Sequence, residues 1–384
     1  MSEKREAVIV AYGRSACCKA RKGSLAGTNP IEYSAEVLQG VLGKVLALDP
    51  SLIEDVILGC AMPVNEMDYN AARMIARRAG LPNSVPGQTI NRFCSSALQA
   101  VATAANAILA GQMDCVVAGG TECMTRCFRP CPEEYIDKKL QEMDEGLYIS
   151  MGETAERVAD RYGVTREAMD RMAYESHKKA LAAQAAGKLD PSIVPIHNAE
   201  GMLLTKDEGI RADISMESLA GLRTCFRENG RVTAATSSQT TDASAFAVLM
   251  SADMAKVLGL KPVAKFISFA AAGCEAEVMG LGPIYAVPKA LKKAGLTLDD
   301  MDVIELNEAF AAQALVCIDQ LGMDPAKVNP YGGAMALGHP MGATGVVLLG
   351  KALDYLKDND KKYALVTMCI GGGMGAAGVF ERID

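Results

Sequence analysis

The sequence is poor in several features that mark particular classes of protein. No stretch gathers Lys and Arg as binding to a phosphate backbone demands, and the formal net charge is −7. The only apolar run near the start, AVIVA, is far shorter than a membrane span or a signal peptide. The last four residues, ERID, are neither an ER nor a peroxisomal address. These features predict a cytoplasmic protein that binds neither nucleic acid nor membrane.

The chain also lacks a recognisable metal motif. Cys123, Cys127 and Cys131 form a C-x3-C-x3-C run, but no His or fourth Cys lies close by and the spacing matches no zinc pattern. We therefore expect no metal and no permanently bound cofactor. The twelve cysteines are expected to be free thiols, because a reducing cytosol does not maintain disulfides.

What the chain does have is an alternation of strand-like and helix-like segments at both ends, which is typical of an α/β architecture. Two halves resemble each other. The Asp-Val pair at Asp55 has a counterpart at Asp302, and the strand pattern around Val117 has one around Val366 at nearly the same offset. Duplication of a βαβ-rich unit explains both matches.

Charged, amphipathic helix patterns interrupt the first half. They run from about residue 122 to residue 221 and are followed by a Ser/Thr-rich stretch that leads into a buried strand. The predicted organisation is a first half made of residues 1–121 plus 222–260, an inserted domain at 122–221, and a second half at 261–384.

Cys94 lies where a strand pattern changes into a helix, in TINRFCSSALQ. Unpaired N–H groups and the helix dipole favour an anion at a helix start, so this thiol is expected to tend toward thiolate. The alternative is an inert, buried cysteine, since free cysteines are among the most buried residues.

Only one of the three histidines lies in a pattern typical of a site. His177 falls on a helix among charges and is expected to be solvated, while His197 follows a proline in a loop. His339 lies in the glycine-rich segment NPYGGAMALGHPMGATG, where the backbone can approach a ligand closely. Tight helix packing is the alternative role for those glycines.

Two further segments carry polar or reactive residues. ALVTMCIGGGMGAAGVF reads as a buried strand ending near Cys369, followed by a glycine turn that includes Gly371. It also matches a dinucleotide fingerprint, but that interpretation fails, because the match leaves no helix, no following strand and no acidic residue about twenty positions on. In DVIELNEAFAAQ, Asn307 and Glu308 stand at a strand-to-helix junction, where Asn is by default a helix cap.

Two cysteines, one histidine, one asparagine and a bare glycine turn suit carbon–carbon bond chemistry on a thioester. A nucleophilic thiolate needs a base to take its proton and donors aimed at the oxyanion that its attack creates. A second thiol can supply a proton at carbon, and no metal is required.

At this point the chain resembles the thiolase family over essentially its whole length. NRFCSSALQA, NEAFAAQ, GGAMALGHPMGATG and CIGGGMG occur in the family's order and spacing. The resemblance implies a five-layered αβαβα fold of two duplicated halves with an inserted loop domain. It also implies that Cys94 becomes acylated, that His339 activates it, and that Cys369 is the acid/base at the substrate α-carbon. His339 with a water held by Asn307 would form one oxyanion hole, and the N–H groups of Cys94 and Gly371 the other.

By the same resemblance coenzyme A is a substrate, and further residues would contact it or the acyl group. Those implied near the nucleotide are Arg211 and Ser218; those along the pantetheine are Phe226, Ala234 and Ser238; and those near the acyl group are Met151 and Met279, with Ala309 and Phe310 of NEAFAAQ completing the substrate site.

The resemblance implies thiolytic cleavage of a 3-ketoacyl-CoA by CoA, or the reverse condensation. A short-chain acetoacetyl-CoA thiolase is the alternative, and a ketosynthase or a non-catalytic acyl-CoA-binding subunit is less favoured. Ser150 stands where members specialised for acetoacetyl-CoA often carry His, which favours longer acyl chains. We expect a homo-oligomer, and the segment from Thr121 to Ser150 looks shorter than in tetrameric members, which hints at a dimer.

Overall fold

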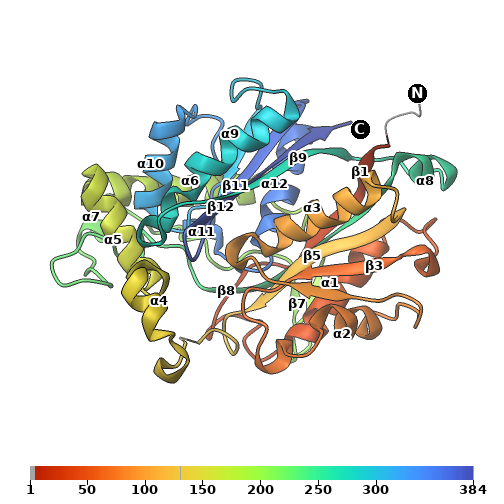
Figure 1. Cartoon of the computed structure of the whole chain (residues 1–384), viewed down its shortest axis with the longest axis horizontal. Coiled ribbons are helices and arrows are strands. Elements are labelled where there is room, and N and C mark those ends of the chain that lie inside the picture. The colour runs from red at the N-terminus through yellow and green to blue at the C-terminus, as the bar shows by residue number, and fades with distance from the viewer. Residues whose placement is uncertain (1–4, 130, 384) are drawn as a thin grey trace.

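The computed structural model describes residues 5–129 and 131–383. Its centre is a ten-stranded sheet in the order β10-β11-β12-β9-β1-β8-β5-β3-β4, with β2 paired to β8 (Figure 1). The strands are β1 Ala7–Arg14, β2 Cys18–Lys19, β3 Asp55–Gly59, β4 Gln88–Ile90, β5 Cys115–Cys123, β8 Thr241–Ser251, β9 Ala264–Gly273, β10 Val303–Leu306, β11 Tyr363–Ile370 and β12 Met374–Arg382.

The sheet itself is duplicated, as the sequence repeat predicts. β3 runs parallel to β5, with Val56 beside Val117, and β10 runs parallel to β11, with Glu305 beside Val366. β5 then pairs antiparallel with β8, and β11 pairs antiparallel with β12. The two halves meet where β1 pairs with β9, over a short register that includes Val8 opposite Lys265.

Helices cover both halves and fill the space between them. α3 (Ser96–Leu109) and α12 (Thr344–Asp358) share one apolar cluster with the inner faces of both half-sheets. α1 (Pro30–Leu42) and α2 (Ala71–Arg78) cover the outer face of the first half, and α9 (Gly282–Ala294) and α10 (Ala311–Leu321) that of the second (Figure 1). The resulting order of layers is αβαβα, so the predicted fold class is confirmed.

Strand alternation explains why each half-sheet can carry helices on both faces. Successive side chains point to opposite faces of a strand. In β5, Val116 joins the inner cluster and Val117 the outer one; in β11, Val366 faces inward and Leu365 outward. Both faces of these strands are therefore apolar, as buried sheets require.

Most of the regular elements in the segment between β5 and β8 are helices. It contains η4 (Glu133–Tyr135), α4 (Lys138–Met143), η5 (Glu145–Leu147), α5 (Met151–Tyr162), α6 (Arg166–Ala185), the short pair β6 (Ile196–His197) and β7 (Leu203–Leu204), and α7 (Met216–Ala220). α5 and α6 pack against α10 in a common apolar cluster. A buried ion pair of 2.6 Å between Arg14 and Asp207 fastens this segment to β1.

The remaining elements are short. They are α8 (Ala252–Val257), α11 (Ala334–Leu337), and the 3-10 helices η1 (Pro50–Leu52), η2 (Asn65–Met67), η3 (Phe93–Ser95) and η6 (Ala276–Leu281). Within residues 5–129 and 131–383, no helix has the length and apolar character that crossing a membrane requires. η3 contacts both β11 and α12, which brings the second half of the chain against the start of α3.

Candidate active site

Cys94 lies in η3, immediately before α3. The turn is tight, because Phe93 adopts a φ of +42°, which is uncommon for a residue with a side chain. Two side chains hold it: Asn91 Oδ1 accepts the N–H of Phe93 at 2.8 Å, and Ser96 Oγ accepts the N–H of Arg92 at 2.9 Å. The nucleophile candidate therefore stands on a strained, well-braced turn at the start of a buried helix.

The expected acidity of Cys94 is wrong. Burial raises the pKa of its thiol to about 11, although hydrogen bonding from the N–H groups of Gly371 and of Cys94 itself lowers the pKa. The negative charge of Glu122 adds to the increase. Loss of hydration outweighs the helix-start effect, because a charged sulfur is costly in an apolar site. The resting residue is a thiol and needs a base.

Gly371 and Cys369 lie beside that thiol. β11 ends at Ile370, and a turn through Gly371–Gly373 returns the chain as β12. Gly372 and Gly373 have φ values of +79° and +78°, which only glycine adopts without strain. Burial raises the pKa of Cys369 well above its usual range, and ionisation of the neighbouring Cys94 raises it further. The glycines of the rejected dinucleotide match lie in this turn and in β12, not before a helix.

His339 is held between α11 and α12 in a fixed orientation. Its Nδ1 lies 2.6 Å from Thr344 Oγ1, and the Thr344 hydroxyl donates to the carbonyl of Pro340 at 3.1 Å. The hydroxyl oxygen thus accepts from Nδ1–H, which leaves Nε2 unprotonated. Burial lowers the pKa of His339 to about 4. The ring is neutral at pH 7 and can accept a proton at Nε2.

Asn307 is the neighbour of that free nitrogen. Its Nδ2 lies 3.4 Å from His339 Nε2, and its Oδ1 is buried with no hydrogen-bond partner in the described part of the chain. The default interpretation of Asn307 as a helix cap is wrong, because the residue that precedes α10 is Phe310. The adjacent Glu308 carboxylate accepts hydrogen bonds from the Ser176 hydroxyl, the Asn329 side-chain amide and the Met335 N–H, so Glu308 has a structural role.

The predicted catalytic residues form two groups, which lie next to the starts of α3 and α12. Cys94, Gly371 and Cys369 form one group, and His339 with Asn307 the other. α12 contacts η3, and Gly345 in the first turn of α12 lies so close to the backbone of Leu98 in α3 that a Cβ would not fit. The fold thus brings Cys94, Gly371 and Cys369 together in one group and His339 and Asn307 together in another, on segments that pack through α3 and α12.

Apolar side chains surround the glycine turn. A Cβ at Gly371 would lie 3.4 Å from Met151 Sδ and 3.8 Å from the Phe93 ring. Next to Gly372 lie Leu147 of η5 and Met374 of β12. Met279 is buried in the same cluster as Cys369. Of the predicted acyl-group residues, Met151 therefore lies next to the glycine turn, and Met279 belongs to the same apolar cluster as the second cysteine.

A cavity of about 230 Å³ contains three of the predicted coenzyme residues. Arg211, Ser218 and Ala234 line it, together with His177 and Leu219 among others. The other predicted contacts are adjacent to one another rather than in this cavity. Ser238 N–H donates to the carbonyl of Ala309 at 2.9 Å, and the rings of Phe226 and Phe310 pack edge to face, 6.0 Å apart.

His177 corrects another expectation, because it is buried rather than solvated. It is 2% exposed, and its Nδ1 accepts the backbone N–H of Arg211 at 3.1 Å. Burial lowers its pKa to about 4, with a further decrease from the charge of Arg211. The helix pattern around His177 is polar, but the chain segment that carries Arg211 covers this position. His197, expected in a loop, lies in the short strand β6, where it is exposed and its Nδ1 is 3.8 Å from Glu36 Oε2.

Comparison with known proteins identifies the family. The family model "Thiolase, N-terminal domain" matches residues 7–253, and "Thiolase, C-terminal domain" matches residues 260–382. The chain belongs to the thiolase family. A 3-ketoacyl-CoA thiolase of Bacillus subtilis (strain 168) is 44% identical, covering 98% of this chain and 99% of the relative. A peroxisomal 3-ketoacyl-CoA thiolase of Homo sapiens is 42% identical, covering 97% and 90%.

Solved structures agree with this assignment. The dimeric peroxisomal thiolase of Saccharomyces cerevisiae superposes with a TM-score of 0.94 at 38% identity, covering 100% of this chain and 99% of that one. The acetyl-CoA acetyltransferase of Bacillus anthracis superposes with a TM-score of 0.91 at 38% identity, covering 99% of each chain. This thiolase is therefore an acyltransferase by family.

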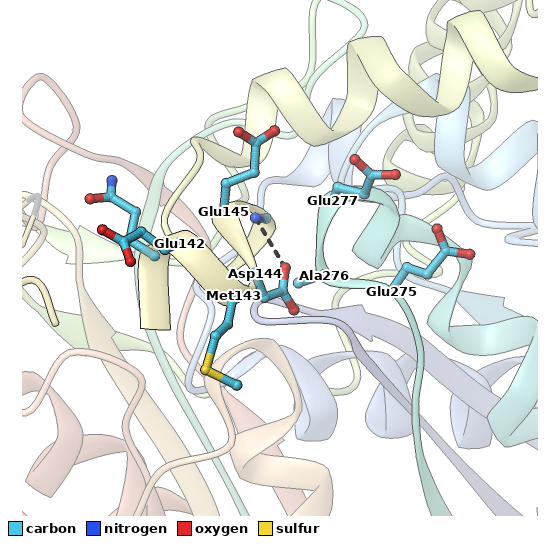
Figure 2. Close-up of a pocket in the computed structure, with 9 residues that line it drawn as sticks. Glu142, Met143, Asp144, Glu145, Glu275, Ala276 and Glu277 are labelled. Carbon is cyan, nitrogen blue, oxygen red and sulfur yellow. Dashed lines mark hydrogen bonds between the residues drawn. The ribbon is translucent and has the colours of Figure 1, made fainter. Parts of the chain in front are cut away.

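The thiolase also has a larger cavity, of about 480 Å³, one of whose lining residues, Ala276, lies against Gly373 of the glycine turn. Figure 2 shows that it lies between the segment of Glu142, Asp144 and Glu145 and that of Glu275 and Glu277. Most of the side chains that line it are acidic. Arginines on α5 pair with several of these carboxylates: Arg157 with Glu145 and Glu277, and Arg161 with Glu275 and Glu277, at 2.6 to 2.9 Å.

Sequence reasoning missed several residues at the site. Leu147 and Met374 flank the glycine turn, Thr344 fixes the tautomer of His339, and Glu122 accepts hydrogen bonds beside it. The only signal for Thr344 was its position in the glycine-rich motif. No group of three or more His, Cys, Asp or Glu in the described ranges could hold a metal ion.

Proposed function

We propose that this thiolase cleaves 3-ketoacyl-CoA with CoA, giving acetyl-CoA and a shortened acyl-CoA, and that it also runs the reverse condensation. The observation that carries the proposal is the position of the Cys94 thiol, which receives the N–H of Gly371 and has Cys369 as a neighbour. Two thiols at one donor-lined turn suit a reaction that forms a thioester on one sulfur and moves a proton at carbon with the other. The full-length relatives named as 3-ketoacyl-CoA thiolases support it.

In cleavage, His339 Nε2 accepts the Cys94 proton as the sulfur attacks the 3-keto carbon. The bond between the α and β carbons breaks, and the acetyl-CoA enolate takes a proton from Cys369. The acyl group stays on Cys94 as a thioester. The Cys369 thiolate recovers its proton from the protonated His339, so that His339 can accept the proton of a second CoA thiol as that sulfur attacks the thioester. His339 then gives this proton to the leaving Cys94 sulfur, the shortened acyl-CoA is released, and all three groups return to their starting forms. The high pKa of Cys94 makes the base essential, because little thiolate exists at rest.

Each tetrahedral or enolate oxygen needs donors. We propose that the N–H groups of Cys94 and Gly371 serve the oxygen of the Cys94 adduct, because both already bond to the sulfur. Asn307 and His339 would serve the oxygen of the enolate, with a water bound by Asn307, whose buried Oδ1 lacks a partner. Removing one such donor typically costs about 3 kcal/mol in the barrier.

We assign coenzyme A to the cavity lined by Arg211, Ser218 and Ala234, with its pantetheine passing Phe226, Ser238, Ala309 and Phe310 toward Cys94. The acyl chain would then pass Met151 and Met279. An Arg guanidinium suits this place, because it can bond a phosphate and stack on adenine. The ligand would thus extend along these residues with its nucleotide in the cavity and its thioester next to Cys94.

Arg211→Ala is expected to raise the KM for CoA about tenfold with little change in kcat, because a uniform binding contact is lost. The matched control is Arg171→Ala on α6, where an exposed arginine pairs only with Glu167 in its own helix. Steady-state thiolysis with varied CoA measures both constants. An unchanged KM in Arg211→Ala would remove Arg211 from the coenzyme site.

Ser150 bears on chain length. It caps α5 by accepting the N–H of Glu153 at 3.2 Å, and it is smaller than the His found there in members specialised for acetoacetyl-CoA. Thiolysis rates on C4, C6, C8 and longer 3-ketoacyl-CoAs test the whole function. We expect a higher kcat/KM for C8 than for C4. Activity confined to C4 would favour the short-chain alternative, and CoA binding without any turnover would indicate a non-catalytic subunit.

We further propose that the protein is a cytoplasmic homodimer. Support for the dimer comes from the similar dimeric yeast thiolase and from β4, a half-exposed strand at the edge of the sheet. Sedimentation velocity would distinguish a dimer from a tetramer, and imaging of the tagged chain in its own cell would test its location, since relatives include peroxisomal proteins.

A further inference from the structure

Glu122 is a buried carboxylate that the mechanism above does not use. It lies near the end of β5 and is 0% exposed. Three backbone N–H groups donate to it: Ala61 at 2.9 Å, Met62 at 3.2 Å and Gly342 at 2.8 Å. The Cys60 thiol lies 3.8 Å away as a fourth donor. Such a concentration of donors on one carboxylate joins chain segments that are far apart in sequence.

One oxygen of Glu122 connects to the loop of His339. Oε2 accepts from Gly342, three residues after His339. The approach is close: a Cβ on Gly342 would lie 2.7 Å from the carbonyl oxygen of Thr121 and 2.9 Å from Oε2 itself. Only glycine allows the loop to come this near, so the contact fixes where the loop stands against β5.

The same oxygen connects to the turn of Cys94. Oε2 also accepts from Ala61, whose carbonyl accepts from Asn91 Nδ2 at 3.0 Å. Asn91 Oδ1 in turn accepts the N–H of Phe93, the residue before Cys94. We call the sequence of groups from Gly342 N–H through Glu122, Ala61 and Asn91 to Phe93 N–H the Glu122–Asn91 relay.

The relay spans the two halves of the molecule. Cys94 belongs to the first half and His339 to the second, and the half-sheets pair directly only through β1 and β9. A nucleophile and its base must keep their geometry within a fraction of an ångström, since a misplacement of about 1 Å can cost about 100-fold in rate. Burial raises the pKa of Glu122 to about 7, while the N–H groups of Ala61, Gly342 and Met62 lower it. In its charged form this carboxylate makes stronger hydrogen bonds than a neutral acceptor, which suits it to this task.

We infer that Glu122 and Asn91 are positioning residues that set the base-bearing loop of His339 against the nucleophile turn of Cys94 through the Glu122–Asn91 relay. Neither residue touches the reacting atoms. The catalytic meaning of the inference rests on the proposed function, whereas the mechanical coupling of the two segments does not.

Three variants test the relay through kcat. Glu122→Leu removes every acceptor, and we expect kcat to fall about 100-fold with the KM for CoA within about twofold. Glu122→Gln is expected to recover at least tenfold of that loss, because its amide oxygen can still accept from Ala61 and Gly342. Asn91→Asp keeps the bond to Phe93 N–H but sets a carboxylate against the carbonyl of Ala61, so kcat should fall about tenfold or more. If Glu122→Leu does not fold, the kcat of Asn91→Asp tests the inference instead.

The matched control is Asp354→Leu. Asp354 is also a buried carboxylate with a pKa raised by burial, and it lies on α12 and bonds to Tyr12 at 2.7 Å, outside the relay. The kcat of Asp354→Leu should stay within twofold of the kcat of the parent protein. The double variant with Glu122→Leu and Asn91→Asp should be no slower than the slower single variant, because both cut one connection. Additive losses, unchanged kcat in the relay variants, or an equal loss in Asp354→Leu would overturn the inference.

Hydrogen exchange followed by mass spectrometry tests the coupling without substrate. Glu122→Leu should speed amide exchange about tenfold in the peptides covering both 91–95 and 339–343, and Asp354→Leu should speed neither. Acceleration at only one of these peptides would show that the relay does not join them. A parent chain without thiolysis activity would refute the proposed function and still give a clear result here.

Discussion

Cys94→Ala is expected to lose thiolysis, condensation and acyl-enzyme formation together, with a fall in kcat of about 10⁴-fold or more. No other described thiol receives the N–H of Gly371 as Cys94 does. Because the side chain shrinks by a single sulfur on a turn held by Asn91 and Ser96, the fold should persist. Intact-protein mass spectrometry after incubation with acetyl-CoA should show an acetyl adduct on the parent and none on the variant.

The control for this experiment is Cys131→Ala, which removes an exposed thiol far along the chain. It should leave the adduct and the thiolysis rate unchanged. Peptide mapping would contradict the assignment by placing the adduct on any residue other than Cys94, or by finding it undiminished in Cys94→Ala.

Cys369→Ala is expected to separate two reactions that Cys94→Ala abolishes together. Acetyl transfer between acetyl-CoA and CoA passes through the Cys94 thioester alone and moves no proton at carbon. Cleavage and condensation do move one, and a positioned proton donor is worth roughly 10² to 10⁴-fold. The variant should therefore keep the exchange of labelled CoA into acetyl-CoA within about tenfold, and lose thiolysis by about 10²-fold or more.

Cys317→Ala provides the comparison, because Cys317 is a fully buried thiol whose charge also acts on Cys369. Its sulfur lies 3.3 Å from the carbonyl oxygen of Gly280. It should lower neither reaction by more than a few-fold. If Cys369→Ala reduced exchange and thiolysis equally, Cys369 would have no special role at the α-carbon.

Local patterns predicted most of the architecture. The matching segments around Asp55 and Asp302 correspond to β3 and β10, which occupy the same place in the two half-sheets. The Ser/Thr-rich stretch does lead into a buried strand, β8. Such patterns predict structure well because the periods of strands and helices depend on neighbouring residues in the sequence, and because a duplicated unit repeats its own burial pattern.

Predictions failed where burial came from distant chain. His177 looks solvated on its own helix, but the segment of Arg211 covers it. Cys94 has the helix start expected to acidify it, but the surrounding layers remove the water that a thiolate needs. Neither the charge pattern of a helix nor the sequence of its first turn indicates which distant segments will pack against that helix.

The sequence by itself determined the family, the duplicated layers and the five residues that we propose carry the chemistry. Four motifs in fixed order and spacing identify the family and contain these residues, and the internal repeat predicts the duplicated layers. Only the tertiary structure decided how acidic those residues are, which nitrogen of His339 is free, and how Glu122 and Asn91 tie the loop of His339 to the turn of Cys94. The physical reason is that loss of hydration and hydrogen-bond geometry depend on atoms that come together in space. These atoms belong to residues as far apart in the sequence as 61, 91, 122 and 342.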